Sequence, residues 1–223
     1  MAELYPLSLD LSGRRCLVVG GGRVAERKVR GLLGAAARVT VVAPEATPAL
    51  AELAERGEIG WRARGFEPGD LDGAALAFVA TSSPEANRAA AAAARERGVW
   101  LNAAEDGRHC DFHVPAVLRR GAVSVAVSTA GASPALAAWV RDRLGSALPA
   151  GLEAAARVLE VVRGLPPKGG LEPGRAARTL LDDGLADDLA RGEWAAADEK
   201  IARVFASATP VREILERTMT EQP

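Results

Sequence analysis

Three small residues at fixed spacing, Gly20, Gly22 and Ala25, suit the binding of a dinucleotide pyrophosphate. They directly follow the apolar run 17–19 and open a stretch that favours a helix. Gly20 permits a tight turn, Gly22 lets backbone amides approach the phosphates, and Ala25 allows close packing of helix on strand. The helix N-terminus adds unpaired amides and a partial positive charge. A compact connection that binds no ligand is the alternative. The expected cofactor contacts are Gly20, Gly21, Gly22, Arg23, Val24 and Ala25.

Four further residues stand where predicted strands end, and open α/β sheets bind their ligands at those carboxyl ends. Pro44 and Glu45 are expected near the adenosine. A carboxylate about 20 residues beyond the glycine turn accepts from the ribose hydroxyls of NAD and repels a 2′-phosphate. Glu45 comes a few residues later, so a solvated residue at a helix start is an equal alternative. Thr81 and Asn102 are expected to line the nicotinamide half, although Asn102 also suits a turn cap.

A dense group of metal-ligating residue types occupies the segment from His109 to His113, with Cys110 and Asp111 between them. Their spacing matches no closed zinc pattern. We therefore predict no resident metal, and direct iron binding by His113 is the alternative. The other cysteine, Cys16, lies within a predicted strand, so the two thiols do not indicate a disulfide framework. A reducing cytoplasm is the expected location.

The glycine turn requires a strand before it and a helix after it, and the chain continues in the same alternation. Continuous apolar runs predict buried parallel strands with helices on both faces. Ser82 and Ser83 before Pro84 suit a helix start, and Gly98 suits its end. The result is a Rossmann-like, doubly wound parallel sheet. The predicted strands are 14–20, 38–43, 59–64, 75–81 and 99–102.

The remainder of the chain has a different pattern. Residues 121–129 alternate apolar and small polar side chains, which predicts a strand with unlike faces. Ser133 and Pro134 then open a helix, and the pattern beyond Gly151 is helical throughout. We predict a small α+β segment followed by an all-helical domain. The expected domains are 1–113, which binds NAD, 114–150, and 151–223.

Composition limits the classes of function. The chain of 223 residues is 48% hydrophobic and 26% charged, as in ordinary globular proteins. A net charge of −1 and an aromatic content of 4% do not indicate the basic, aromatic-rich surface that binds nucleic acid. No segment approaches the roughly 18 apolar residues that cross a bilayer. Neither nucleic acid nor a membrane is an expected partner.

Three blocks of sequence resemble the precorrin-2 dehydrogenase family, which includes the dehydrogenase and ferrochelatase module of siroheme synthase. The blocks are 18–28, 102–116 and 125–141. The resemblance covers about the first 150 residues. It implies oxidation of precorrin-2 to sirohydrochlorin with NAD⁺ and, in some members, insertion of Fe²⁺ to give siroheme. It also implies a homodimer in which the middle segment, 114–150, makes contacts between subunits.

The resemblance also implies roles for particular residues. In the family, a carboxylate three positions after the asparagine that matches Asn102 transfers protons or binds metal, and it is usually aspartate. The matching residue is Glu105, and Asp106 follows it. Either carboxylate can accept a proton, but that of glutamate lies one methylene farther from the backbone. This departure from aspartate weakens the expectation of chelatase activity more than that of dehydrogenation.

The implied substrate carries eight carboxylates and therefore needs cations and amide donors. The turn 128–133 before a helix offers hydroxyls and amides, and arginines lie on either side of it. Each arginine is equally well explained as a surface charge. The expected substrate contacts are Ser128, Thr129, Gly131, Ser133, Arg119 and Arg141.

Two other classes of function fit the glycine turn. A non-catalytic NAD(H)-binding, redox-sensing module would need an effector element, and the tail is acidic at 182–183 and 187–188 rather than suited to DNA. A short-chain reductase would need a tyrosine and a lysine four positions apart on a helix. The single tyrosine, Tyr5, precedes the first strand, which excludes that class.

Overall fold

The computed structural model describes residues 4–103, 110–206 and 209–220. The chain divides into two compact units, Met1–Val114 and Pro115–Pro223, and each is considered by itself. The further boundary expected near residue 150 stays a prediction.

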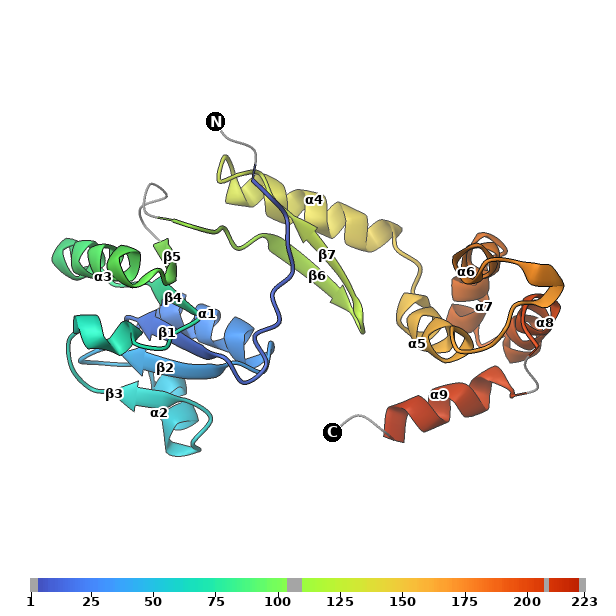
Figure 1. Cartoon of the computed structure of the whole chain (residues 1–223), viewed down its shortest axis with the longest axis horizontal. Helices are drawn as coiled ribbons and strands as arrows, with labels where there is room; N and C mark the ends of the chain where they lie inside the picture. Colours follow the sequence, from blue (N-terminus) through green and yellow to red (C-terminus); the bar gives the residue numbers. More distant parts are fainter. Residues whose placement is uncertain (1–3, 104–109, 207–208, 221–223) are drawn as a thin grey trace. The chain divides into compact units, whose positions relative to one another are not determined.

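The first unit is a parallel sheet of five strands in the order β3-β2-β1-β4-β5 (Figure 1). Every neighbouring pair is parallel. The chain moves outward from β1 to β3 and then crosses to β4 on the other side of β1, which is the doubly wound arrangement predicted from the sequence. The elements are β1 (Arg15–Val19), α1 (Arg23–Leu33), β2 (Arg38–Val42), α2 (Pro48–Glu55), β3 (Gly60–Arg62), η1 (Pro68–Leu71), β4 (Leu76–Val79), α3 (Pro84–Arg97) and β5 (Trp100–Ala103).

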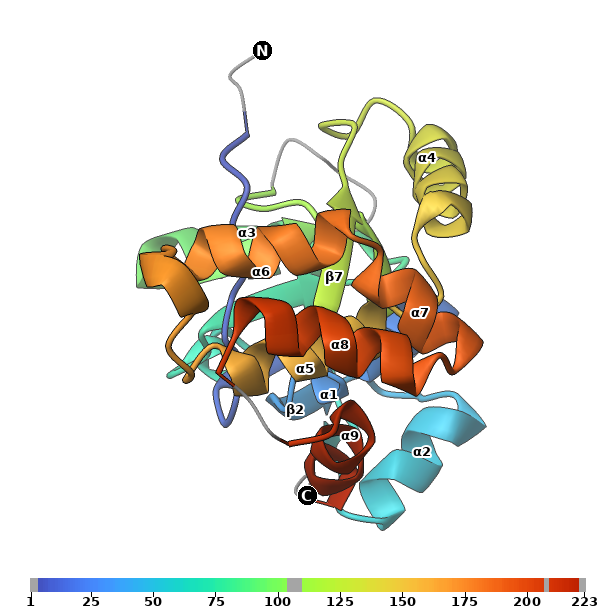
Figure 2. The same cartoon turned by 90° about the vertical axis from the view of Figure 1, so that its right-hand side faces the viewer.

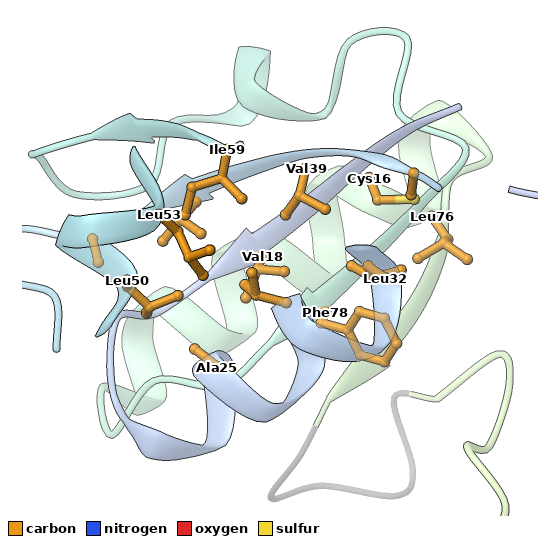
Figure 3. Packing of buried hydrophobic residues seen from close by; sticks show 14 residues of the cluster. Cys16, Val18, Ala25, Leu32, Val39, Leu50, Leu53, Ile59, Leu76 and Phe78 are labelled. Carbon is orange, nitrogen blue, oxygen red and sulfur yellow. The ribbon is translucent and has the colours of Figure 1, made fainter. Parts of the chain in front are cut away.

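Alternate strand residues face two separate apolar layers. Val18 of β1 and Phe78 of β4 pack with Ala25 of α1 in one layer (Figure 3). Leu17 and Ala77 pack with the small alanines of α3 in the other layer. Full burial of a valine or leucine contributes roughly 1.5–3 kcal/mol, so coverage on both faces explains the continuous apolar runs.

The caps of α3 confirm the sequence prediction. The Ser83 hydroxyl accepts from the Ala86 amide at 3.2 Å, and Pro84 occupies the first helical turn. Gly98 ends the helix in the left-handed conformation, with φ +65°. A serine N-cap contributes about 1 kcal/mol. The helix therefore ends at Gly98, two residues before β5 begins at Trp100.

The second unit begins with an antiparallel pair, β6 (Ala116–Arg120) and β7 (Val123–Val127), which α4 (Pro134–Ala147) contacts. The sequence prediction missed β6. Side chains of β7 alternate between half-buried and exposed, as predicted. The helical remainder buries its own core around Val158, Leu180 and Phe205, and Figure 2 shows the helices themselves. Its helices are α5 (Leu152–Val162), α6 (Pro173–Asp182), α7 (Leu185–Arg191), α8 (Trp194–Val204) and α9 (Val211–Thr220), with the short turn η3 (Lys168–Gly170).

A buried ion pair joins two of these helices. Asp188 of α7 is 4% exposed, and its carboxylate contacts Lys200 of α8 and Arg191, the latter at 2.8 Å. The pair with Lys200 fixes α7 against α8, since removing the Asp188 carboxylate would leave the largely buried ammonium of Lys200 without this counter-ion. Among the helices that the structure describes, none has the length and apolarity to cross a membrane.

Candidate functional site

The turn after β1 forces glycine at two positions. Gly20 has φ +119°, and a Cβ built on it would lie 2.3 Å from the carbonyl oxygen of Ala80. A Cβ on Gly21 would lie 1.9 Å from the carbonyl oxygen of Glu45. The dinucleotide motif treats the middle position as variable, so the packing at Gly21 is a feature of this chain that the motif did not reveal. Both glycines bring the turn close to neighbouring loops.

Gly22 differs from its neighbours because the surrounding protein does not require a glycine there. Its φ is −84°, and apart from Gly22 and its two chain neighbours, no atom of the described residues lies within 4 Å of a Cβ built on it. Gly22 also stands at the N-cap of α1, where it supplies no side-chain acceptor. The first amides of α1 have no partner within the helix and are available to an anion. This arrangement fits a pyrophosphate.

The next three residues of the expected cofactor site divide by exposure. Ala25 is fully buried and packs α1 on the sheet, as the third small position of the motif requires. Arg23 and Val24 are exposed on the first turn of α1. Their backbone amides therefore remain the relevant donors.

The loop after β2 is tied to the glycine turn by two hydrogen bonds. The Thr47 amide donates to the Gly21 carbonyl at 2.9 Å, and the Thr47 hydroxyl donates to the Glu26 carboxylate at 3.1 Å. Hydrogen bonds from Arg30 and then Thr47 lower the pKa of Glu26 below its ordinary value. The sequence prediction missed this connection. It holds Pro44 and Glu45, which are both exposed, beside the turn at the end of β2.

Thr81 and Asn102 follow or end their strands as expected. Thr81 is half-buried; its hydroxyl accepts from the Ser83 amide at 2.8 Å, and its carbonyl accepts from Asn87 at 3.1 Å. Asn102 is 8% exposed, and its amide nitrogen donates to the Phe112 carbonyl at 2.8 Å. That amide nitrogen therefore holds the segment after β5, which resembles the structural alternative considered for this residue.

The predicted catalytic residues, Glu105 and Asp106, lie outside the described residues, as does His109. Cys110 packs its sulfur on β5, where it accepts from the Ala103 amide at 3.3 Å. The Asp111 carboxylate accepts from the Leu101 amide at 2.8 Å. Across residues 4–103, 110–206 and 209–220, no three His, Cys, Asp or Glu side chains gather as a metal site would require.

The turn expected to bind substrate has a left-handed backbone. Ala130 and Gly131 have φ of +51° and +84°, and the Ala132 amide donates to the Thr129 carbonyl at 2.9 Å. This is the geometry of a type I′ turn. The Ser133 hydroxyl caps α4 by accepting from the Leu136 amide at 3.2 Å.

The other residues expected to contact the substrate differ in the hydrogen bonds and ion pairs that they already make. The Ser128 hydroxyl accepts from the Ala130 amide at 3.2 Å. Arg119 is exposed on β6, opposite Ser124. Arg141 pairs with its neighbour Asp142 at 2.7 Å. A substrate carboxylate would therefore compete with Asp142 for Arg141.

Comparisons with known proteins relate both units of the chain to described families. A family model for NAD(P)-binding matches residues 7–116, and a model for the central part of sirohaem biosynthesis proteins matches residues 120–147. The siroheme synthase of Chromobacterium violaceum is 41% identical over 209 residues, which are 92% of this chain and 44% of that protein. The siroheme synthase of Methylobacillus flagellatus is 43% identical over 148 residues, which are 66% of this chain and 32% of that protein. The chain thus spans less than half the length of these relatives.

A solved structure matches nearly the whole chain. The precorrin-2 dehydrogenase SirC has a TM-score of 0.67 and 26% identity, and the match covers 97% of this chain and 100% of that one. The fold and the glycine turn define the class as an NAD(P)-binding domain of the Rossmann type. Within that class, the chain is similar to the precorrin-2 dehydrogenase SirC over 97% of its length and to the matching part of siroheme synthases over up to 92% of its length.

Proposed function

We propose that this chain oxidises precorrin-2 to sirohydrochlorin with NAD⁺ as the acceptor. A hydride passes from the tetrapyrrole to the nicotinamide, and one proton is released. The observation that carries the proposal is Gly22, which leaves space at the start of α1 and gives the helix no side-chain cap, although the fold itself would accept a side chain there. Such a position is explained by a ligand that needs the space.

Glu105 or Asp106 is the proposed acceptor of the released proton. A carboxylate close to the reacting carbon would accelerate the step as a general base. Pro44 and Glu45 are proposed to contact the adenosine, and Thr81 and Asn102 the nicotinamide half. In the second unit, the proposed contacts to the substrate carboxylates are Ser128, Thr129, Gly131, Ser133, Arg119 and Arg141.

Insertion of Fe²⁺ into sirohydrochlorin is a second proposed activity, with iron as a substrate. The observation that favours it is the similarity to proteins named siroheme synthase. The same carboxylates, Glu105 and Asp106, would take up the pyrrole protons that the metal displaces.

A homodimer is the proposed assembly. Helix α4 leaves three large apolar side chains exposed: Leu136 at 50%, Trp139 at 59% and Leu144 at 42%. Exposed apolar residues of this size on one element are typical of a protein interface. The proposed location is the cytoplasm, and in the described part of the chain Cys16 and Cys110 form no disulfide.

An anaerobic assay tests the proposed activity. Precorrin-2 is generated in situ and its absorbance is followed with and without NAD⁺, and then after Fe²⁺ is added. We expect sirohydrochlorin to form only with NAD⁺. The rate should fall at least 100-fold in one of the two variants, Glu105→Ala or Asp106→Ala, which identifies the proton acceptor. Wild-type protein that binds NAD⁺ but oxidises nothing above background would refute the enzyme and favour the redox-sensing module.

A further inference from the structure

Lys28 of α1 holds its ammonium group over an aromatic ring. The Nζ atom lies 4.8 Å from the centroid of Phe78 on β4. Phe78 is fixed by packing against α1 (Figure 3) and by an edge-to-face contact with Phe112, with centroids 5.4 Å apart. The half-buried ammonium group of Lys28 therefore packs against a rigidly held ring face.

Lys28 has no anionic partner among the residues that the structure describes. Its neighbour on the same helix, Arg30, forms an ion pair with Glu26 at 2.9 Å. Of the other lysines, Lys200 pairs with Asp188, and Lys168 donates to the Ala202 carbonyl at 2.6 Å. Lys28 thus differs from these cations in having a ring as its partner rather than an oxygen.

Desolvation makes this arrangement costly for the cation. Burial lowers the pKa of Lys28 below its ordinary value, and the nearby charge of Arg27 lowers it further, while the Cys110 thiol acts in the opposite sense. Partial burial of an ammonium without a counter-ion is unfavourable unless a ligand supplies the charge. Such groups are concentrated at functional sites.

The position of Lys28 separates it from the pyrophosphate. Lys28 lies six residues beyond Gly22, which is about 9 Å along the helix at 1.5 Å per residue. The ring under its ammonium group belongs to Phe78, which pairs in register with Asn102 of β5. Asn102 is one of the residues proposed to contact the nicotinamide half of the cofactor. An anion over Phe78 would thus belong to the molecule that reacts with the nicotinamide.

We propose that Lys28 binds a carboxylate of the tetrapyrrole substrate. The inference rests on the proposed oxidation of precorrin-2 and adds a specificity-determining residue to it. The substrate is rich in carboxylates, and an ammonium held on an aromatic ring is a well-oriented partner for one of them. Binding would supply a counter-ion that Lys28 lacks among the described residues.

Substitutions at Lys28 test this proposal against a purely structural role. Lys28→Met keeps an unbranched apolar side chain over Phe78 but removes the charge, and Lys28→Arg keeps the charge. Arg27→Met is the matched control, because Arg27 is an exposed cation on the same helix. The readouts are the KM for precorrin-2, the KM for NAD⁺, the Tm, and the Kd for sirohydrochlorin from tryptophan quenching.

We expect Lys28→Met to raise the KM for precorrin-2 and the Kd for sirohydrochlorin about tenfold, the effect of one charge-assisted contact. The KM for NAD⁺ and the Tm stay unchanged, Lys28→Arg recovers most of the binding, and Arg27→Met changes little. An unchanged sirohydrochlorin Kd in Lys28→Met overturns the inference. So does a loss of stability that Lys28→Arg shares, with no selective loss of binding. Failure of the wild type to oxidise precorrin-2 refutes the proposed activity instead, and the Kd still decides the role of Lys28.

Discussion

The carbonyl oxygen of Ala80 approaches the Cα of Gly20 so closely that a side chain on Gly20 would collide with it at 2.3 Å. Gly20 follows β1 and Ala80 follows β4, so the contact joins the ends of these two strands at the point where the strand order reverses. Ligands of doubly wound folds bind outside this point. Gly20 therefore serves the fold and places the cofactor turn.

Gly20→Ala is expected to destabilise the protein. The left-handed φ disfavours a side chain, and the carbonyl of Ala80 would have to move, which together cost at least about 2 kcal/mol. Chemical denaturation of the wild type and the variant measures the difference. Gly31→Ala is the control, because outside its own helix backbone and chain neighbours no described atom lies within 4 Å of a Cβ there. Equal stability of Gly20→Ala and wild type would show that the turn relaxes freely.

Ala36→Gly is expected to stabilise the protein by about 1 kcal/mol. Ala36 has φ +54°, a left-handed conformation that costs an alanine roughly 1–2 kcal/mol and a glycine much less. The greater freedom of glycine in the unfolded chain offsets part of this gain. A rise in the urea midpoint without a change in slope would confirm it. A lower midpoint would contradict the strain at Ala36.

Asp70→Asn is expected to cost about 2–3 kcal/mol at pH 7. The carboxylate is fully buried and accepts from Arg62, from Arg64 at 2.7 Å, and from the Glu67 amide at 2.9 Å. Removing one charge from a buried network leaves its partners uncompensated. The matched control is Asp72→Asn, since Asp72 is 72% exposed in its pair with Arg97 and should change stability by less than about 0.5 kcal/mol.

The effect of Asp70 should also depend on pH. Burial alone would raise its pKa, but hydrogen bonds from Arg64, the Glu67 amide and Arg62 leave it below the ordinary value of 3.8. Because the folded-state pKa is depressed, the stabilisation is complete above about pH 4 and is lost as the pH falls through the folded value. The difference between wild type and Asp70→Asn should therefore shrink below pH 4. A difference that grows on acidification would contradict this sign.

Trp139→Asp is expected to convert a dimer to a monomer. Trp139 is 59% exposed on α4, and a carboxylate there would be costly to bury against a second copy. Analytical ultracentrifugation at micromolar concentration measures the change. The control Trp194→Asp alters another exposed tryptophan, 37% accessible, in the helical part. A monomeric wild type would contradict the proposed assembly.

The sequence predicted those elements whose signals are local. Runs such as 38–43 are apolar because helices cover both faces of the sheet, and Ser83, Gly98 and Ser133 cap helices by contacts within a few residues. Strand β6 was missed because its residues end in Arg119 and Arg120 and do not alternate. Its partner is β7, and only the pairing reveals it.

The site was predictable only in part, because several of its contacts join distant segments. Gly20 and Gly22 follow from spacing, but the approach of Gly21 to Glu45, the bond from Thr47 to Glu26, and the ring beneath Lys28 depend on packing. No periodicity or motif encodes such contacts. The roles assigned to Glu105 and Asp106 remain predictions.

Calorimetric titration of NAD⁺ into Gly22→Ala tests the central claim most directly, with Gly31→Ala as the control on the same helix. The fold has space for a methyl group at both positions, so both variants should fold, Gly31→Ala with at least the wild-type Tm and Gly22→Ala with a Tm slightly lower, because alanine is a poorer N-cap than glycine. The account predicts that Gly22→Ala weakens NAD⁺ binding at least tenfold, while Gly31→Ala binds like the wild type. Unchanged affinity in Gly22→Ala would contradict a pyrophosphate at the start of α1, and with it the proposed dehydrogenase site.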